Sequence, residues 1–145
     1  MMNRDEMGTL RRIQALQKDI VAPLVEAHRG RIFKLIGDGV LAEFQSVHDS
    51  FAGAIGILEA LEQSDLDLVV RIGLHIGDLI FEDGDVFGDG VNIAARLEGV
   101  ARPGTIAVSE RAWSDLGKTT TGFKDLGRVT LKNIRDPVRV YLYEL

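Results

Sequence analysis

A Gly-Asp-Gly step between two short apolar runs is the feature that most constrains what this chain can fold into. The runs RIFKLI and VLAEF flank Gly37, Asp38 and Gly39, and both are rich in residues that favour strands. Glycine and aspartate tolerate the backbone conformations of tight turns, so the pattern predicts a β-hairpin. An antiparallel pair of strands is therefore expected near the start of the chain.

Helices are predicted on both sides of this hairpin. Apolar residues recur at helical spacing over about residues 5–28, where Pro23 must kink or break the helix, and Gly30 is the expected stop. A second helix is predicted over about residues 47–63, with Ser46 as its N-cap.

The remaining elements alternate between short strands and helices. In chain order we predict strands over 66–77 and 78–85, a helix over 88–101, a strand over 105–109, a helix over 110–116, and strands over 121–127 and 137–145. This order predicts an α+β fold with a mainly antiparallel sheet. At 145 residues the whole chain, 1–145, has the length of one domain.

Composition excludes several classes of protein. The net charge of −5 argues against a nucleic-acid partner, and the absence of cysteine excludes disulfides, thiol nucleophiles and cysteine-based zinc sites. His28, His48 and His75 lack metal-ligand spacing. We find no apolar run long enough for a membrane span and no signal peptide, so a cytoplasmic location is expected by default.

Two groups of polar residues have both an ordinary and a functional interpretation. Lys34, Ile36 and Asp38 share parity, so an extended chain would point them to one side, although an aspartate beside glycine is also common at a hairpin tip. Asn92 and Arg96 are four residues apart in a predicted helix and could donate hydrogen bonds to a ribose or a phosphate. They could equally belong to a solvated polar stripe.

Two further polar features have simpler explanations. The segment EDGDVFGDG suggests an exposed loop; a calcium loop is conceivable, but the segment lacks the spacing and terminal glutamate of an EF-hand. Lys132 lies where one run ends and a turn begins, and most such lysines are surface charges. None of these signals is specific by itself.

Taken together, four segments resemble the catalytic domain of class III nucleotidyl cyclases, and most closely the bacterial adenylyl cyclases. These segments are GRIFKLIGDGVLAEF, RIGLHIGDLIFEDGDVFGDGVNIAARLEG, PGTIAVSE and LGRVTLKNIRDPVRVY, and the likeness extends over nearly the whole chain from about Asp5. The resemblance implies a ferredoxin-like fold and a homodimer with its active sites at the subunit interface. It also implies that the chain binds ATP and forms cyclic AMP and pyrophosphate in intracellular signalling.

The resemblance also assigns roles to individual residues. Asp38 matches the second of two metal-binding aspartates, which hold two Mg²⁺ or Mn²⁺ ions in the family. Lys34 and Asp85 match the pair that selects the base. Adenine offers an acceptor at N1 and a donor at N6, so a lysine donor and an aspartate acceptor favour ATP over GTP. Asp38 and Lys34 of one chain serve different active sites in the family.

The other three matched residues act on the ribose and the phosphates. Asn92 matches the residue that orients the ribose, and Arg96 matches the residue that stabilises charge on the pentavalent phosphorus. Lys132 matches the lysine that binds the triphosphate, although LKNI departs from the glycine-rich K-G-K form of the family.

One expected element of the family is not found in this sequence. Family members begin with a strand that carries the first metal-binding aspartate, whereas here the opening MMNRDEMGTL resembles the segment just after that strand. We therefore expect an N-terminally truncated domain with weak metal binding, slow or no turnover, and unpaired strand edges that favour strand exchange or an atypical dimer.

Two alternatives to a cyclase are compatible with the same sequence. The first is a catalytically inactive cyclase-like module that dimerises or senses nucleotide. The second, a ferredoxin-like RNA-binding domain, has little support because the chain is acidic and its strands lack exposed aromatic pairs.

Overall fold

The computed structural model describes residues 2–77, 80–82, 85–117 and 122–145, with the backbone alone for 2–5, 80, 81 and 85–87. The elements, in chain order, are α1 (Met2–Ala15), the π-helix η1 (Leu16–Val21), α2 (Ala22–Ala27), β1 (Gly30–Ile36), β2 (Gly39–Phe44), α3 (Val47–Glu62), β3 (Ile72–Leu74), β4 (Ile80–Glu82), β5 (Asp85–Phe87), α4 (Asp89–Val100), β6 (Thr105–Ser109), α5 (Glu110–Leu116), β7 (Phe123–Val129) and β8 (Val138–Glu144).

A four-stranded sheet forms the centre of the molecule. Its strand order is β3-β6-β8-β7, in which β3 and β6 are parallel and the other two pairs are antiparallel. The β1–β2 and β4–β5 pairs form two separate antiparallel hairpins. Helices and a mixed sheet confirm the predicted α+β fold.

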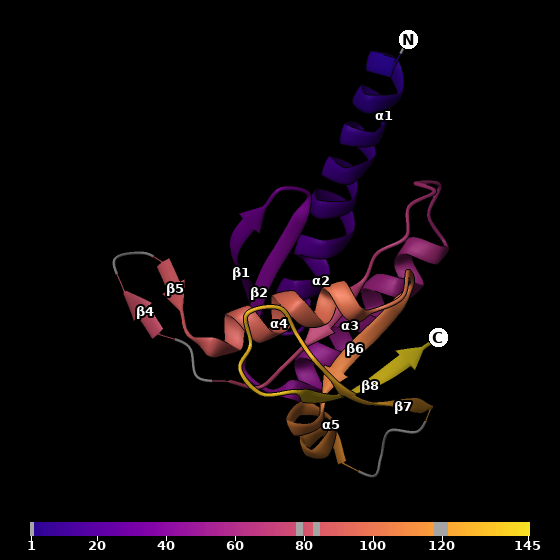
Figure 1. Cartoon of the computed structure of the whole chain (residues 1–145). Helices are drawn as coiled ribbons and strands as arrows, with labels where there is room; N and C mark the ends of the chain where they lie inside the picture. Colours follow the sequence, from indigo (N-terminus) through magenta and orange to yellow (C-terminus); the bar gives the residue numbers. More distant parts are fainter. Residues whose placement is uncertain (1, 78–79, 83–84, 118–121) are drawn as a thin grey trace.

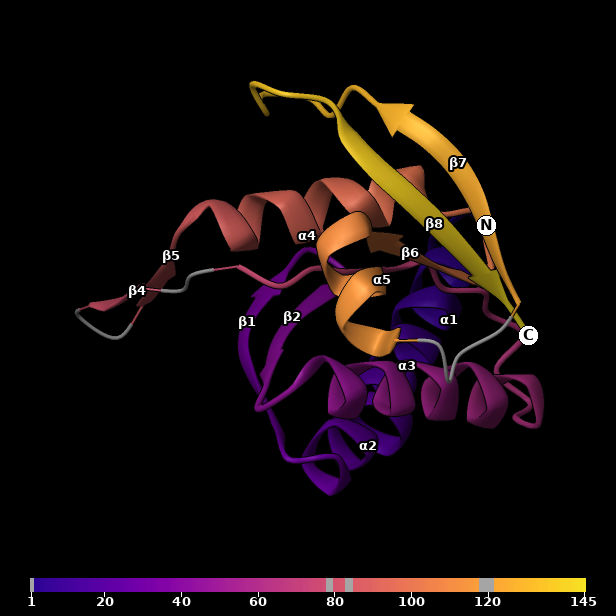
Figure 2. The same ribbon diagram turned by 90° about the horizontal axis from the view of Figure 1, so that it is seen from below.

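Strand β6 shows how the sheet is covered, because all five of its residues are buried. Ile106 and Val108 pack with residues of α3 and α5, whereas Ala107, between them, packs with Leu97 of α4. Side chains alternate across a strand, so α3 and α5 cover one face of the sheet and α4 covers the other. Figure 2 shows α4 and α3 on opposite sides of β6.

The N-terminal helical segment confirms the expected break near Pro23. The chain leaves α-geometry over Leu16–Val21, and Pro23 lies in the first turn of α2. Proline has no N–H to donate to the carbonyl four residues earlier, and a π-turn accommodates this loss. On the N-terminal side of this break, α1 extends away from the rest of the molecule (Figure 1).

The prediction that Gly30 stops this helix was wrong. Helix α2 ends at Ala27, and Arg29 adopts the left-handed conformation with φ 62°, while Gly30 already begins β1. The glycine is needed there for space: a Cβ on Gly30 would lie 2.5 Å from the ring of Phe44. The close packing of Gly30 against Phe44 of β2, rather than the end of the helix, explains why a glycine occupies this position.

The predicted capping of α3 is confirmed, whereas two predicted strands differ from the structure. The Ser46 hydroxyl accepts a hydrogen bond from the N–H of Asp49 at 3.1 Å. Within predicted strand 66–77 only Ile72–Leu74 forms a strand, because only these residues pair with β6. The predicted single strand 78–85 contains β4 and the first residue of β5, whose connecting residues lie outside the described chain.

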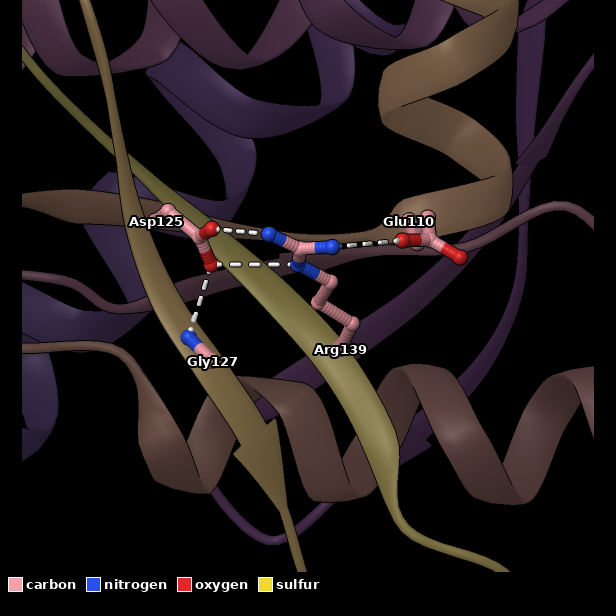
Figure 3. A network of polar contacts seen from close by, with 4 residues as sticks. All are labelled: Glu110, Asp125, Gly127 and Arg139. Carbon is pink, nitrogen blue, oxygen red and sulfur yellow. Dashed lines mark hydrogen bonds and ion pairs between the residues drawn. The ribbon is translucent and has the colours of Figure 1, made fainter.

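An ion-pair network joins β7, β8 and α5 at the C-terminal edge (Figure 3). Arg139 of β8 donates to both carboxylate oxygens of Asp125, and lies 3.7 Å from Glu110. Asp125 also accepts the N–H of Gly127, a residue with φ 76° at a bulge in β7. The hydrogen bond from Arg139, followed by that from Gly127, lowers the pKa of Asp125. These contacts lie at the bulge in the edge strand β7.

Candidate active site

The β1–β2 hairpin presents Asp38 at its tip. Ile36 pairs with Gly39, which leaves a two-residue turn, and Gly37 has φ 57°. A positive φ at the first turn residue alone is the geometry of a type II′ turn, and glycine adopts it without strain. The Asp38 side chain is exposed, and no hydrogen bond or ion pair of its carboxylate is seen within the described chain. A carboxylate placed this way is available to a ligand.

Lys34 lies on the same hairpin next to a bulge. The pairing shifts between Ile32 and Lys34, so Phe33 is the extra residue on β1. Phe33 is half-buried, whereas Lys34, Leu35 and Ile36 are all exposed. Consecutive side chains of a strand point to opposite faces, so both faces of the hairpin end are exposed. The alternation of residues had predicted this only for the face that carries Lys34, Ile36 and Asp38. Bulges of this kind are common beside active sites, where they redirect side chains.

Helix α4 carries Asn92 and Arg96 on its exposed face. Both side chains are exposed, and they lie one turn apart, while Leu97 on the opposite face is fully buried. The helix lies directly on β3, because a Cβ on Gly73 would be 2.5 Å from the carbonyl oxygen of Ala94. The close contact of β3 and α4 fixes where this polar pair stands relative to the sheet.

The other two predicted residues lie in segments that neighbour α4, Asp85 before its N-terminus and Lys132 next to a residue of its core cluster. Asp85 begins β5, where it pairs with Glu82, and β5 leads through Gly88 into α4; the Asp85 side chain lies outside the described part of the structure. Lys132 is exposed in the connection from β7 to β8, and the preceding Leu131 is buried in the same core cluster as Leu97. Figures 1 and 2 place the β4–β5 hairpin beyond the N-terminal end of α4.

The structure brings the candidates together in pairs rather than as one site. Asp38 and Lys34 share a hairpin, and Asn92 and Arg96 share a helix face. Among the described side chains, we see no hydrogen bond or ion pair between the two pairs, and no group of three or more His, Cys, Asp or Glu residues could hold a metal ion. One chain therefore offers two partial sites.

Asp38 nevertheless fits one part of a magnesium site. Mg²⁺ prefers oxygen ligands and is commonly held by one or two carboxylates together with substrate phosphates and water. The exposed Asp38 carboxylate supplies one such ligand without first breaking an ion pair. The donor set of this chain thus fits a cation that is shared with phosphate groups.

A groove of about 720 Å³ lies elsewhere and has a different character. Its lining includes β2, β3, α4 and α5, and the described lining residues include Glu43 and Asp115 but no Lys or Arg. Strands β2 and β3 each have one sheet neighbour among the described strands, so an edge of each remains open. Because its described lining has no positively charged side chain, the groove is unsuited to a triphosphate. In this respect it differs from the exposed face of α4, which carries Arg96.

His75 lines this groove, and the sequence alone predicted no role for it. Its Nδ1 lies 2.7 Å from the hydroxyl of Ser109, which also caps α5 by accepting the N–H of Ala112. Burial, and secondarily the charge of Arg111, lower the pKa of His75. A neutral ring nitrogen can accept a hydrogen bond from the Ser109 hydroxyl, so the pair joins the residue that follows β3 to the N-cap of α5.

Comparison with known proteins identifies the family. The family model described as "Adenylate and Guanylate cyclase catalytic domain" matches residues 24–144. "Putative adenylate cyclase 3" of Rhizobium meliloti (strain 1021) is 40% identical over 150 residues, covering 99% of this chain and 26% of that protein. "pH-sensitive adenylate cyclase MT1302" of Mycobacterium tuberculosis is 30% identical, covering 97% of this chain and 35% of that protein. The chain thus spans about a quarter to a third of these relatives.

Solved structures agree with this result. The crystal structure of an adenylate/guanylate cyclase/hydrolase from Silicibacter pomeroyi superposes with a TM-score of 0.82 at 35% identity, covering 94% of this chain and 85% of that one. The adenylyl cyclase CyaB from P. aeruginosa, at 20% identity, shares the fold with a TM-score of 0.71, covering 92% and 80%. Within the described residues no helix combines the length and apolar character of a membrane span. The chain belongs to the family of adenylate and guanylate cyclase catalytic domains, as its sequence motifs predicted.

Proposed function

We propose that this domain converts ATP to cyclic AMP and pyrophosphate. The ribose 3′-oxygen attacks the α-phosphorus, the bond from the α-phosphorus to the bridging oxygen of the β-phosphate breaks, and the hydroxyl proton passes to solvent. The observation that carries the proposal is the exposed face of α4, where Asn92 and Arg96 stand one turn apart within the segment that the cyclase family model matches. We also propose that residues 1–145 act as a single domain in the cytoplasm.

The α4 pair and Lys132 would act on the ribose and the phosphates. The Asn92 amide orients the ribose so that its 3′-oxygen faces the α-phosphorus. The Arg96 guanidinium donates hydrogen bonds to oxygens on which charge grows in the transition state. Lys132, exposed beside the cluster that holds Leu97, binds the outgoing phosphates. An exposed helix face suits this work because ATP is large and charged.

The hairpins would read the base. A lysine ammonium only donates hydrogen bonds and a carboxylate only accepts them, which matches N1 and the N6 amine of adenine. Guanine presents a donor at N1 and an acceptor at O6, so it meets Lys34 and Asp85 with like groups. This complementarity supports ATP as the substrate.

Asp38 would hold the divalent cation, Mg²⁺ or Mn²⁺. A cation bound there would lower the pKa of the 3′-hydroxyl and offset the charge of the phosphates. The carboxylate is exposed at the tip of a defined turn, which leaves it free to share the ion with ATP. The family's first carboxylate position has no match in this sequence, so Asp38 is the family carboxylate that this chain can contribute.

Two copies of the chain would complete each active site. Among the described side chains, no hydrogen bond or ion pair joins Asp38 to Arg96 within one chain, yet the reaction needs both at one phosphorus. We therefore propose a homodimer in which the hairpin tip of one subunit faces the α4 surface of its partner.

Cyclic AMP formation from Mn-ATP tests this function. We expect product formation by the wild type and a loss of at least about a hundredfold in kcat for Arg96→Ala, because one charge-stabilising group is removed from the transition state. Arg102→Ala, an exposed arginine just after α4, is the matched control and should keep wild-type activity.

The opposite result would favour a different function. If the wild type binds ATP but forms no cyclic AMP at any Mn²⁺ concentration, the domain is a nucleotide-sensing or dimerisation module rather than a catalyst.

A further inference from the structure

The side chain of Gln17 reaches the hairpin tip from a helix. Its Nε2 donates a hydrogen bond to the backbone carbonyl oxygen of Asp38 at 3.1 Å, across 21 residues of sequence. In a two-residue hairpin the strand ladder closes between Ile36 and Gly39, so the Asp38 carbonyl has no ladder partner. A carbonyl of this kind is satisfied by water or by a side chain, and here a side chain takes it.

The helix that presents Gln17 is held firmly by the core. Gln17 lies in η1, and Leu16 and Ile20 of the same element are buried against Ile57 and Leu61 of α3. Short π-helical insertions occur frequently at functional sites, where they change which residues face a neighbouring element. Gln17, which contacts the hairpin, therefore directly follows the buried residue Leu16.

The hydrogen bond acts on the backbone of the residue that carries the proposed metal ligand. Fixing the Asp38 carbonyl fixes its peptide plane and so restricts where its Cα–Cβ bond points. Gly37 alone would not hold this orientation, because glycine is the most mobile residue of a turn. Metal ligands lose affinity when the groups that orient them are removed.

We propose that Gln17 is a positioning residue for the Asp38 carboxylate. This inference rests on the proposed role of Asp38 as a metal ligand. Gln17 does not touch substrate or metal; it holds the turn so that the carboxylate is already oriented when Mn²⁺ arrives. Its removal then weakens metal binding more than it weakens the chemical step.

The test compares Gln17→Met with the wild type. Methionine keeps the length of the side chain but cannot donate the hydrogen bond. We expect the Mn²⁺ concentration for half-maximal cyclic AMP formation to rise about tenfold, with kcat at saturating Mn²⁺ changed by less than about twofold. Lys18→Met, the exposed neighbour on η1, is the matched control and should leave the Mn²⁺ dependence unchanged.

A second readout does not depend on turnover. Mn²⁺ bound at Asp38 broadens the amide resonances of Gly37 and Gly39, and titration of the full chain gives its affinity directly. We expect Gln17→Met to require about tenfold more Mn²⁺ for the same broadening.

The outcomes separate this inference from the proposed function. Equal Mn²⁺ titrations for Gln17→Met and the wild type, or a loss of kcat alone, would overturn the positioning role. No broadening of Gly37 and Gly39 in the wild type would overturn it together with the metal role of Asp38. A wild type that forms no cyclic AMP, while the broadening still shifts in Gln17→Met, would refute the cyclase function and leave the positioning role standing.

Discussion

Five of the proposed functional residues are exposed, Lys34 among them, and this has a consequence for stability. The side chains of Asp38, Asn92, Arg96 and Lys132 contribute little to the core. Exposed charges are typically worth less than about 1 kcal/mol to a fold. Their replacement should therefore change activity while leaving thermal unfolding almost unchanged, so that a loss of product can be read as chemistry.

Base selection is a prediction at the scale of one residue. In Lys34→Glu a hydrogen-bond donor becomes an acceptor, which no longer suits N1 of adenine but does suit N1–H of guanine. We expect the ratio of kcat/KM for ATP over GTP to fall at least about tenfold. The ratio is measured with both Mn-nucleotides in parallel.

The control for base selection is Lys124→Glu, which makes the same charge change at an exposed residue of β7. An unchanged ratio in Lys34→Glu, or an equal fall in both variants, would show that Lys34 does not read the base.

His75 carries a prediction about pH. Its folded pKa is lowered, chiefly by burial, whereas the imidazole of the unfolded chain titrates near 6.5. Below pH 6.5 the unfolded chain binds more protons than the folded one, so the free energy of unfolding should fall with falling pH until the folded pKa is passed. Urea unfolding at pH 8 and pH 5.5 should show this fall in the wild type and a smaller one in His75→Gln.

His48→Gln is the control for this experiment, because His48 is exposed. It should keep the pH dependence of the wild type. If His75→Gln keeps it as well, the burial of His75 does not contribute to the pH dependence of stability.

At the scale of elements, two glycines make opposite predictions about α4. Gly73 of β3 has the backbone of α4 within 2.5 Å of where a Cβ would stand, whereas Gly99 in α4 has nothing within 4 Å. Gly73→Ala should destabilise the fold by about 1–3 kcal/mol because the helix must move away. Gly99→Ala should stabilise it by up to about 1 kcal/mol through helix propensity.

Chemical denaturation of both variants measures these two effects. Equal effects of the two substitutions would contradict the close packing of α4 on β3. A Gly73→Ala variant with normal stability but lower kcat would instead place the effect in the position of Asn92 and Arg96.

Elements with local signals were predicted well from the sequence. The Gly-Asp-Gly turn, the Ser46 cap and the break at Pro23 depend on neighbouring residues, and the structure confirms all three. Features that depend on contacts between residues far apart in the sequence were not predicted. Gly30 is required by Phe44, the length of β3 is set by β6, and the bulge at Phe33 has no signature in its own segment.

The same distinction holds for the candidate site. Motif spacing selected residues that the structure places on one hairpin and one helix face, because spacing of four in a helix is a local property. The contact of Gln17 with Asp38 and that of His75 with Ser109 join residues 21 and 34 positions apart. No local pattern encodes such pairs, so only the folded chain reveals them.

At the scale of the whole molecule, the distribution of the proposed site is the main observation. Its two halves lie on the β1–β2 hairpin and on α4, and among the described side chains no hydrogen bond or ion pair joins one half to the other. In a dimer with two-fold symmetry, each hairpin tip could face the α4 of the other subunit, which would complete two equivalent active sites. Function would then be a property of the pair of chains, and each single chain would contribute half of every site.

Mixing two inactive variants tests this account most directly. Asp38→Ala and Arg96→Ala are purified separately, and each should form no cyclic AMP from Mn-ATP. After mixing and exchange of subunits, half of the dimers are mixed and carry one intact site of two, so about a quarter of wild-type activity should return. A mixture as inactive as its two components, beside an active wild type, would contradict a site shared between subunits; a wild type without product would contradict the cyclase function itself.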